Sequence, residues 1–370
     1  MYKNDFLLAD SCYLLNHSVG RPLKTAEQAF KDSFLSPWQH SGTEPWGDWL
    51  NIIEQFKAGL AQLFNGNADD FCPQVNLSSA LTKLVMSLEQ LQHPKLVVLM
   101  SESDFPSMGF ALQKALADSA EIRFIDKSLD ITDINVWDEH LTKDVNLAFI
   151  SNAYSNTGQL APVAELLPLA KSRNILTVLD IAQSAGVIPL NLRTQTPDFM
   201  IGSSVKWLCG GPGSAYLWVN PLHIDNCTPK DVGWFSHEKP FEFDIHHFNY
   251  QSNAMKFWGG TPSITPFALS AHSIAYFANI GANQIRAHNQ KMIDLVVNEF
   301  APQLVSPADA DKRSGTMILD FGDKQQQILG TLKDNNISVD ARHLGMRVSP
   351  HIYNDRADME NFISLIKQVY

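Results

Sequence analysis

Lys206 and Asp180 are the two residues of this 370-residue chain whose type and position best fit chemistry on a small ligand. Lys206 stands between DFMIGSSV and WLCGGPG, and Asp180 ends the apolar run ILTVLD. A lysine at a buried strand end must lower its pKa or be used covalently. A carboxylate there can cap a helix, or it can keep a pyridinium nitrogen protonated. The pair predicts pyridoxal phosphate (PLP) bound as a Schiff base to Lys206. An exposed loop lysine and an ordinary helix cap are the alternatives.

A helix predicted to begin near Leu77 provides a candidate phosphate site. Ser78 and Ser79 stand in its first turn, where free amide groups and the positive end of the helix dipole favour an anion. Ordinary capping by serine explains this pattern equally well. Two further residues could contact the same ligand, Ser203 and Gln183.

Phe105 and Arg347 are candidates that pattern alone assigns to structural roles. Phe105 follows the run KLVVLM, where an aromatic ring can stack on a flat ligand but more often belongs to the core. Arg347 could bind a carboxylate bidentately, or it could form a surface ion pair. Three loop histidines, His237, His246 and His247, could hold a metal. Because adjacent loop histidines are more often solvated, we expect no metal.

Alternating strands and helices must position these residues. Strands are predicted at Leu96–Met100, Ile122–Ile125, Leu147–Ile150, Ile175–Leu179, Phe199–Ile201 and Ala215–Val219. Helical patterns such as Met108–Asp118 and Val163–Ser172 lie between them. This alternation predicts an α/β fold, a mainly parallel sheet sandwiched by helices, with ligands just past the carboxyl ends of the strands.

The C-terminal third predicts a smaller α+β domain. After the irregular segment 221–260, the sequence pattern predicts helices to about Phe300. Strands and helices then alternate at Thr316–Asp320, Gln325–Asn335, Met346–Val348 and Arg356–Lys367. We expect residues 1–45 to contribute to the small domain and the active site, 46–250 to form the large ligand-binding domain, and 251–370 to form the small domain.

Composition excludes several classes of function. The formal net charge of −11 argues against nucleic acid as the main partner. The N-terminus MYKNDFLLADSC lacks the apolar run of a signal peptide, and the chain has no membrane-length apolar stretch. The four cysteines form no CxxC pair, so a cytoplasmic protein is expected. Without a GxGxxG motif, a nicotinamide-dependent oxidoreductase is disfavoured.

The chain resembles class V aminotransferases of PLP fold type I, and most closely kynureninases, over nearly its whole length. The most specific element is DIAQSAGVIPLNLRTQTPDFMIGSSVKWLCGGPG. Further matches are NTGQ, SDFPSMGFAL, GWFSHEKPF, GGTPSI and DARHLGMRVSPHIYN. The resemblance implies that Lys206 carries the Schiff base, Asp180 pairs with the ring nitrogen and Phe105 stacks on the ring. Leu77 and Ser78 would then lie at the phosphate.

The same resemblance implies residues on the substrate side. Arg347 would hold the substrate carboxylate, and His40 is a weaker match to a histidine beside the substrate. Trp234 and Thr261 would close the site. Thr261 would do so across the interface of a homodimer.

Three departures from kynureninases bear on the activity. Val205 replaces a tyrosine, Met108 an aspartate and Gln183 a histidine. No cysteine lies near Arg347, which disfavours ordinary cysteine desulfurase chemistry. The resemblance implies an enzyme acting on an amino acid, with kynureninase-like hydrolysis of a Cβ–Cγ bond. Transamination, β-elimination or epimerisation of another amino acid, and a non-catalytic binding protein, are the alternatives.

Overall fold

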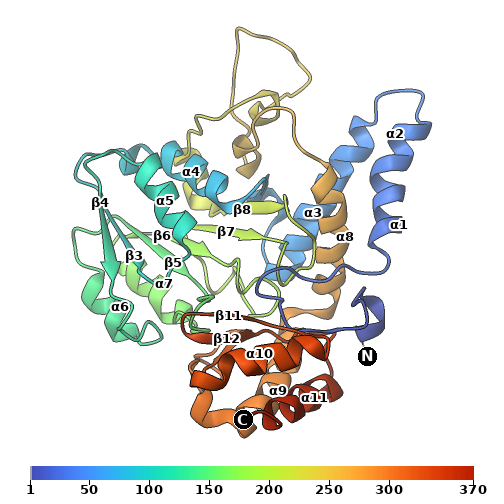
Figure 1. The fold of residues 1–370 in the computed structure, drawn as a ribbon. Coiled ribbons are helices and arrows are strands. Elements are labelled where there is room, and N and C mark those ends of the chain that lie inside the picture. The colour runs from blue at the N-terminus through green and yellow to red at the C-terminus, as the bar shows by residue number, and fades with distance from the viewer. Residues whose placement is uncertain (1) are drawn as a thin grey trace.

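A seven-stranded sheet forms the centre of the computed structural model, which describes residues 2–370 (Figure 1). Its strand order is β2 (Phe71–Gln74), β8 (Ala215–Val219), β7 (Phe199–Ser203), β6 (Leu176–Asp180), β5 (Leu147–Ser151), β3 (Val97–Ser101) and β4 (Glu121–Ile125). The run from β7 to β4 is parallel, and β8 lies antiparallel to both β7 and β2. The predicted mainly parallel sheet is confirmed.

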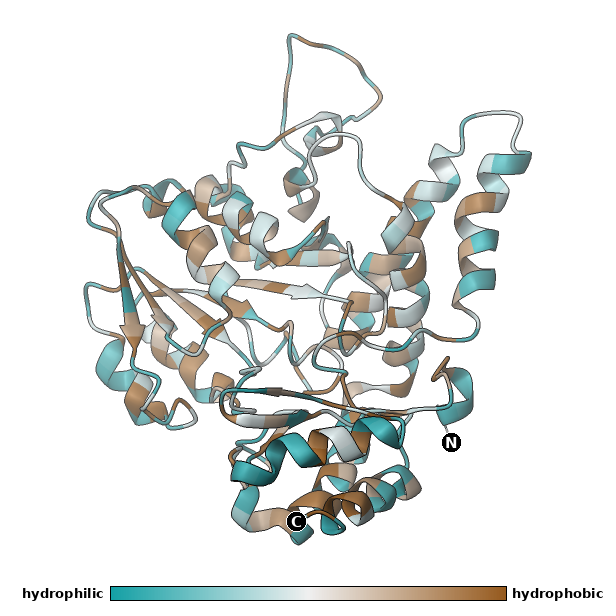
Figure 2. Cartoon of the chain, viewed as in Figure 1, coloured by the Kyte–Doolittle hydropathy of each residue, from teal (hydrophilic) through white to brown (hydrophobic). Residues whose placement is uncertain are grey.

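Helices cover both faces of this sheet (Figure 1). Because crossovers between parallel strands are right-handed, the strand order puts α4 (Leu77–Ser87) and α5 (Pro106–Ala115) on one face, and α6 (Ile134–His140) and α7 (Val163–Ser172) on the other. Buried on both faces, β3, β5, β7 and β8 consist entirely of buried residues. Figure 2 accordingly shows apolar colour along the central strands and hydrophilic colour on outer helices such as α10 (Gln325–Asp334).

Two apolar cores support the remaining elements. The larger core joins the sheet to α3 (Trp46–Phe64) and α8 (Thr265–Ile280), which pack together. The smaller core contains the C-terminal half of α9 (Ala282–Phe300). The other helices are α1 (Ala26–Phe30) and α2 (Ser36–His40) near the N-terminus, with α10 (Gln325–Asp334) and α11 (Arg356–Lys367) around the smaller core. The domain boundaries at residues 45 and 250 stay predictions.

Two small sheets accompany the smaller core. One has the order β11 (Asp340–Arg342), β12 (Gly345–Val348) and β9 (Met317–Leu319). The other pairs β1 (Cys12–Tyr13) with β10 (Ile337–Ser338) in parallel. The N-terminal chain is therefore built into the C-terminal region.

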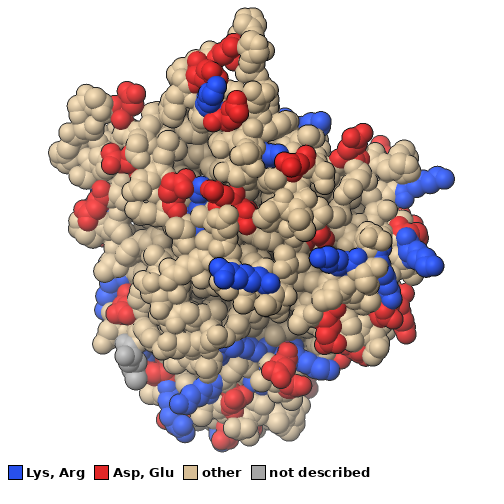
Figure 3. All heavy atoms as spheres, turned by 180° about the vertical axis from the view of Figure 1, so that it is seen from behind, with Lys and Arg blue, Asp and Glu red and all other residues tan. Residues whose placement is uncertain are grey.

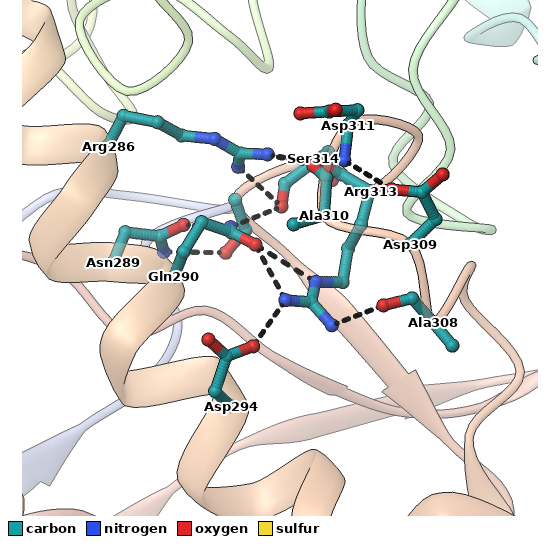
Figure 4. A network of polar contacts seen from close by, with 11 residues as sticks. Arg286, Asn289, Gln290, Asp294, Ala308, Asp309, Ala310, Asp311, Arg313 and Ser314 are labelled. Atoms are coloured by element: carbon teal, nitrogen blue, oxygen red, sulfur yellow. Dashed lines mark hydrogen bonds and ion pairs between the residues drawn. The ribbon is translucent and has the colours of Figure 1, made fainter.

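A buried arginine fastens the segment 308–314 to α9 (Figure 4). Arg313 is 1% exposed, and its guanidinium donates to Gln290 Oε1 at 2.8 Å and Asp294 Oδ1 at 2.7 Å. The backbone on either side of Arg313 pairs with the turn that follows β5, where the carbonyl oxygen of Gly158 accepts a hydrogen bond from Ser314 N–H at 2.7 Å. Arg313 thus links the smaller core to the NTGQ turn.

The surface carries both positively and negatively charged side chains. Acidic and basic side chains are interspersed on the face seen from behind (Figure 3). Among residues 2–370, none of the helices combines the length and apolarity needed to cross a bilayer.

Candidate active site

The carboxyl edge of the large sheet forms a cavity of about 360 Å³. Strands β2, β3, β5, β6 and β7 end at this edge, and the antiparallel β8 begins there. Most of the residues predicted for the site line this cavity: Leu77, Ser78, Phe105, Asp180, Gln183, Ser203 and Lys206. Residues separated by more than 100 positions in sequence therefore meet at one place.

Lys206 and Asp180 face the cavity from neighbouring strand ends. Asp180 is the last residue of β6, and Lys206 follows the last residue of β7 by three positions. Burial lowers the pKa of Lys206; the charge of Asp180 opposes this change. The guanidinium groups of Arg347 and Arg342 lower the Lys206 pKa further. A lysine with a lowered pKa offers more of the neutral amine that attacks a carbonyl.

Burial changes the pKa of Asp180. Burial raises its pKa to about 6, against a hydrogen bond of 2.8 Å from Ala182 N–H and the charge of Lys206. A cationic ligand atom close to this carboxylate would reverse the shift, because an opposite charge favours the ionised form.

The N-terminus of α4 lies at the cavity. Asn76 caps the helix by accepting a hydrogen bond from Ser79 N–H at 2.8 Å. Leu77 and Ser78, the first two residues of the helix, line the cavity. Ser79 itself does not line it; its amide is used by the cap. The arrangement suits an anion at the helix N-terminus.

Three predicted residues do not line the cavity. His40 is exposed at the end of α2, with Nδ1 3.0 Å from the carbonyl oxygen of Ser36. Trp234 packs in an aromatic cluster, its ring centroid 5.5 Å from that of Trp46. Thr261 is exposed. Their roles at the site, including the role of Thr261 across a dimer, stay predictions.

Arg347 is buried beside the cavity without lining it. The residue is 4% exposed, and its Nε donates to Asp340 Oδ1 at 2.9 Å. Its charge reaches Lys206, since it contributes to the lowered pKa of that lysine. The sequence left a surface ion pair as the alternative for Arg347. Arg347 does form an ion pair, with Asp340, but its own side chain is buried.

Tyr154 and Ser214 line the cavity but were not identified from the sequence. Burial raises the pKa of Tyr154 well above its usual value, and the carboxylates of Asp104 and Asp180 add to this effect. Tyr154 follows β5 by three positions, so the rule that ligands bind after strand ends could have identified it.

The positions that depart from kynureninases also belong to the cavity. Val205 and Met108 line it, as does Gln183. None of the four cysteines lines it. The loop histidines do not converge: His237 bonds to the backbone of Asn249 at 2.9 Å, and His247 pairs with Asp244 at 2.6 Å.

Unpartnered polar atoms indicate that the cavity suits a polar ligand such as PLP. Gln183 Oε1 and Ser214 Oγ are buried without a hydrogen-bond partner among residues 2–370. A buried polar atom without a partner is unfavourable, so a ligand that bonds to these atoms would stabilise the site. A lysine, a carboxylate and a helix N-terminus around the same cavity match the amine-reactive, basic and anionic parts of PLP.

Comparisons with known proteins agree with this geometry. The profile of the family described as aminotransferase class-V matches residues 30–365. A kynureninase of Shouchella clausii is 29% identical, covering 99% of this chain and 90% of its own length. A kynureninase of Geobacillus thermodenitrificans is 25% identical, covering 100% of this chain and 90% of its own length.

Solved structures share the whole fold. A cysteine desulfurase from Thermococcus onnurineus gives a TM-score of 0.86 at 19% identity, covering 99% of this chain and 96% of its own. A C-DES variant with glycine covalently linked to its PLP cofactor gives 0.86 at 17% identity, covering 98% of each chain. The fold-type-I architecture predicted from the sequence is confirmed.

Proposed function

The chain belongs to the class V aminotransferase family of PLP-dependent enzymes, and from this premise we propose that it hydrolyses an amino acid of the kynurenine type at the cavity around Lys206. The observation that carries the proposal is the meeting of Lys206 and Asp180 at one cavity, in a chain 29% identical to a kynureninase.

Residues of the cavity would hold the cofactor from several directions. Lys206 would bind PLP covalently through Nζ, and Asp180 would face its ring nitrogen. The amides of Leu77 and Ser78 would bind the phosphate. Phe105, whose side chain is half-exposed at the cavity mouth, would cover the ring and limit the access of water. When bound, PLP supplies an electron sink for a carbanion at the substrate Cα.

The chain's own groups would move and hold the protons. Lys206 Nζ would be a free amine once the substrate amine had replaced it on PLP. It would then accept the proton from the substrate Cα, because burial favours its neutral form. The Asp180 carboxylate would keep a proton on the ring nitrogen. Arg347 would bind the substrate carboxylate and orient the Cα–H bond.

Cleavage of kynurenine would add water to its γ-carbonyl and release alanine and anthranilate. Transamination, β-elimination and epimerisation use the same residues up to removal of the Cα proton. Thiol-dependent desulfuration is disfavoured because no cysteine lines the cavity. A cytoplasmic location is part of the proposal, since all four cysteines are free thiols.

The test is product analysis of the PLP-loaded enzyme with L-kynurenine and a panel of other L-amino acids. We expect alanine and anthranilate in equal amounts from wild type and none from Lys206→Ala. Turnover of another amino acid alone would replace hydrolysis by one of the other class V reactions. Bound PLP without turnover of any substrate would favour a non-catalytic binding protein.

A further inference from the structure

The guanidinium of Arg347 is held on one edge by residues that the proposed mechanism does not use. Asp340 faces Arg347 across the β11–β12 ladder. Its Oδ1 accepts from Arg347 Nε at 2.9 Å, and its Oδ2 accepts from Arg347 Nη2. Oδ1 also lies 2.9 Å from Nε2 of His17, a residue 323 positions away in sequence.

The direction of each hydrogen bond follows from the charges. Burial alone would raise the pKa of Asp340, but His17 and Arg347 lower it well below its usual range. The carboxylate therefore only accepts, and His17 Nε2 must donate. Burial lowers the pKa of His17, so its ring is neutral and Nδ1 accepts from Ser349 Oγ at 2.6 Å. Thr316 Oγ1 then donates to Ser349 Oγ at 2.8 Å.

This arrangement leaves part of the guanidinium available. Arginine has N–H donors on more than one edge, and Asp340 uses the edge formed by Nε and Nη2. Nη1 of Arg347 donates to no atom within residues 2–370. The available edge can take the two oxygens of a carboxylate without breaking the contact with Asp340.

The segment that carries His17 also contacts the lysine side of the site. Gln183 Nε2 donates to the backbone oxygen of His17 at 3.0 Å. Asn16 Nδ2 lies 3.4 Å from the backbone oxygen of Lys206. One short segment of the N-terminal chain thus touches both the lysine loop and the partner of Arg347.

We propose that His17 and Asp340 are positioning residues that fix the guanidinium of Arg347 relative to Lys206. In this position the guanidinium binds the carboxylate of an amino-acid substrate. The inference rests on the proposed function in one respect, the assignment of Arg347 to the substrate carboxylate. Positioning by rigid contacts is effective because small displacements of a binding group are costly in catalysis.

The test compares two ligands that differ only in the carboxylate. Dissociation constants for L-alanine and ethylamine are measured from the absorption change of the PLP-loaded protein. In Asp340→Asn and His17→Gln, L-alanine binding should weaken by about tenfold or more, which corresponds to about 1.4 kcal/mol. Ethylamine binding should stay within about twofold. Asp323→Asn, an exposed aspartate with no role in the network, is the control.

Two outcomes would overturn the proposal. Unchanged or tighter binding of L-alanine by Asp340→Asn would mean that Asp340 does not position Arg347 or competes with the substrate. Equal losses for both ligands would indicate general damage to the site.

A second readout needs no ligand and therefore separates the proposal from the proposed function. Nitrogen NMR of labelled histidine should show His17 protonated at Nε2 and unprotonated at Nδ1 at neutral pH, with its signals identified by their loss in His17→Gln. A proton on Nδ1 would overturn the network. If wild type binds neither ligand while His17 has the expected tautomer, the proposed function is wrong, but the hydrogen-bond network of His17, Asp340 and Arg347 is confirmed.

Discussion

Asp104 is a buried carboxyl group beside the cavity whose protonation affects the whole fold. It is 7% exposed, and Ser101 N–H donates to its Oδ2 at 2.8 Å. Burial raises its pKa to about 7 in spite of this hydrogen bond. The folded chain therefore keeps a proton on Asp104 over a pH range in which the unfolded chain releases it.

This raised pKa predicts a pH dependence of stability. The contribution of Asp104 is full below the ordinary carboxyl pKa near ~4 and is lost as the pH rises through about 7. Asp104→Asn should remove this loss. The fall in the free energy of unfolding between about pH 5 and about pH 8 should then shrink, by on the order of 2 kcal/mol. Urea unfolding of the PLP-free protein measures this. The exposed Asp118→Asn should follow wild type, and the same behaviour in Asp104→Asn would contradict the argument.

The capped start of α4 is the element that we expect to hold the phosphate. Asn76→Ala removes the hydrogen bond to Ser79 N–H and should destabilise the protein by about 1 kcal/mol. It should also weaken PLP binding, because the amides of Leu77 and Ser78 would lose their fixed direction. Unfolding curves and PLP titrations measure the two effects.

Asp133→Ala is the matched control, since Asp133 caps α6, whose residues do not line the cavity. It should lower stability similarly and leave PLP affinity unchanged. Equal losses of PLP affinity in the two variants would mean that the α4 cap acts only on stability.

The regular elements were predictable because their signals are local. All six strands predicted for the large sheet are present, with boundaries within two residues. Strand β2 was missed because it has four residues and contains Pro73, which an edge strand tolerates.

The hydrogen-bond network that holds Arg347 was not predictable in the same way. His17 and Asp340 stand 323 positions apart, and each one alone reads as an ordinary polar residue. Lys206 and Asp180 were found because each lies at or just after the end of an apolar strand. The partners of Arg347 depend instead on how the N-terminal chain pairs with the C-terminal region.

At the scale of the whole molecule, the segment around Arg313 joins α9 of the smaller core to the turn around Gly158. Figure 4 shows the contacts of the Arg313 side chain with α9. Arg313→Met removes a buried guanidinium and leaves Gln290 and Asp294 without their donor. The free energy of unfolding should fall by about 2 kcal/mol, because Gln290 Oε1 and the Ala308 carbonyl lose their donor, whereas water can solvate the exposed Asp294. Chemical unfolding measures the change. Arg356→Met, which breaks the exposed pair with Glu360, is the control and should have little effect. Similar small effects in both variants would contradict a structural role for Arg313.

We also propose a homodimer, supported by the loop between the paired residues His237 and Tyr250. This loop projects from the top of the molecule in Figure 1. Phe243 is 78% exposed and Ile245 is 93% exposed on this loop. Neighbouring exposed apolar side chains are typical of a contact surface. Sedimentation should give about twice the chain mass of 41.3 kDa, and Phe243→Asp with Ile245→Asp should shift the protein toward monomer.

Leu222→Asp, at a 76% exposed position on another segment, should leave the dimer intact. A wild-type monomer at micromolar concentration that still binds PLP tightly would contradict the dimer and the expected role of Thr261.

The central claim is that Lys206 binds PLP covalently in the cavity beside Asp180. The most direct measurement is the visible absorption spectrum of PLP-loaded protein before and after borohydride, for wild type and Lys206→Ala, followed by mass spectrometry of peptides. We predict a yellow band in wild type that borohydride removes, leaving a pyridoxyl mass on the peptide that contains Lys206, and neither feature in Lys206→Ala. A wild-type protein without this band, or with the pyridoxyl mass on another lysine, would contradict the claim.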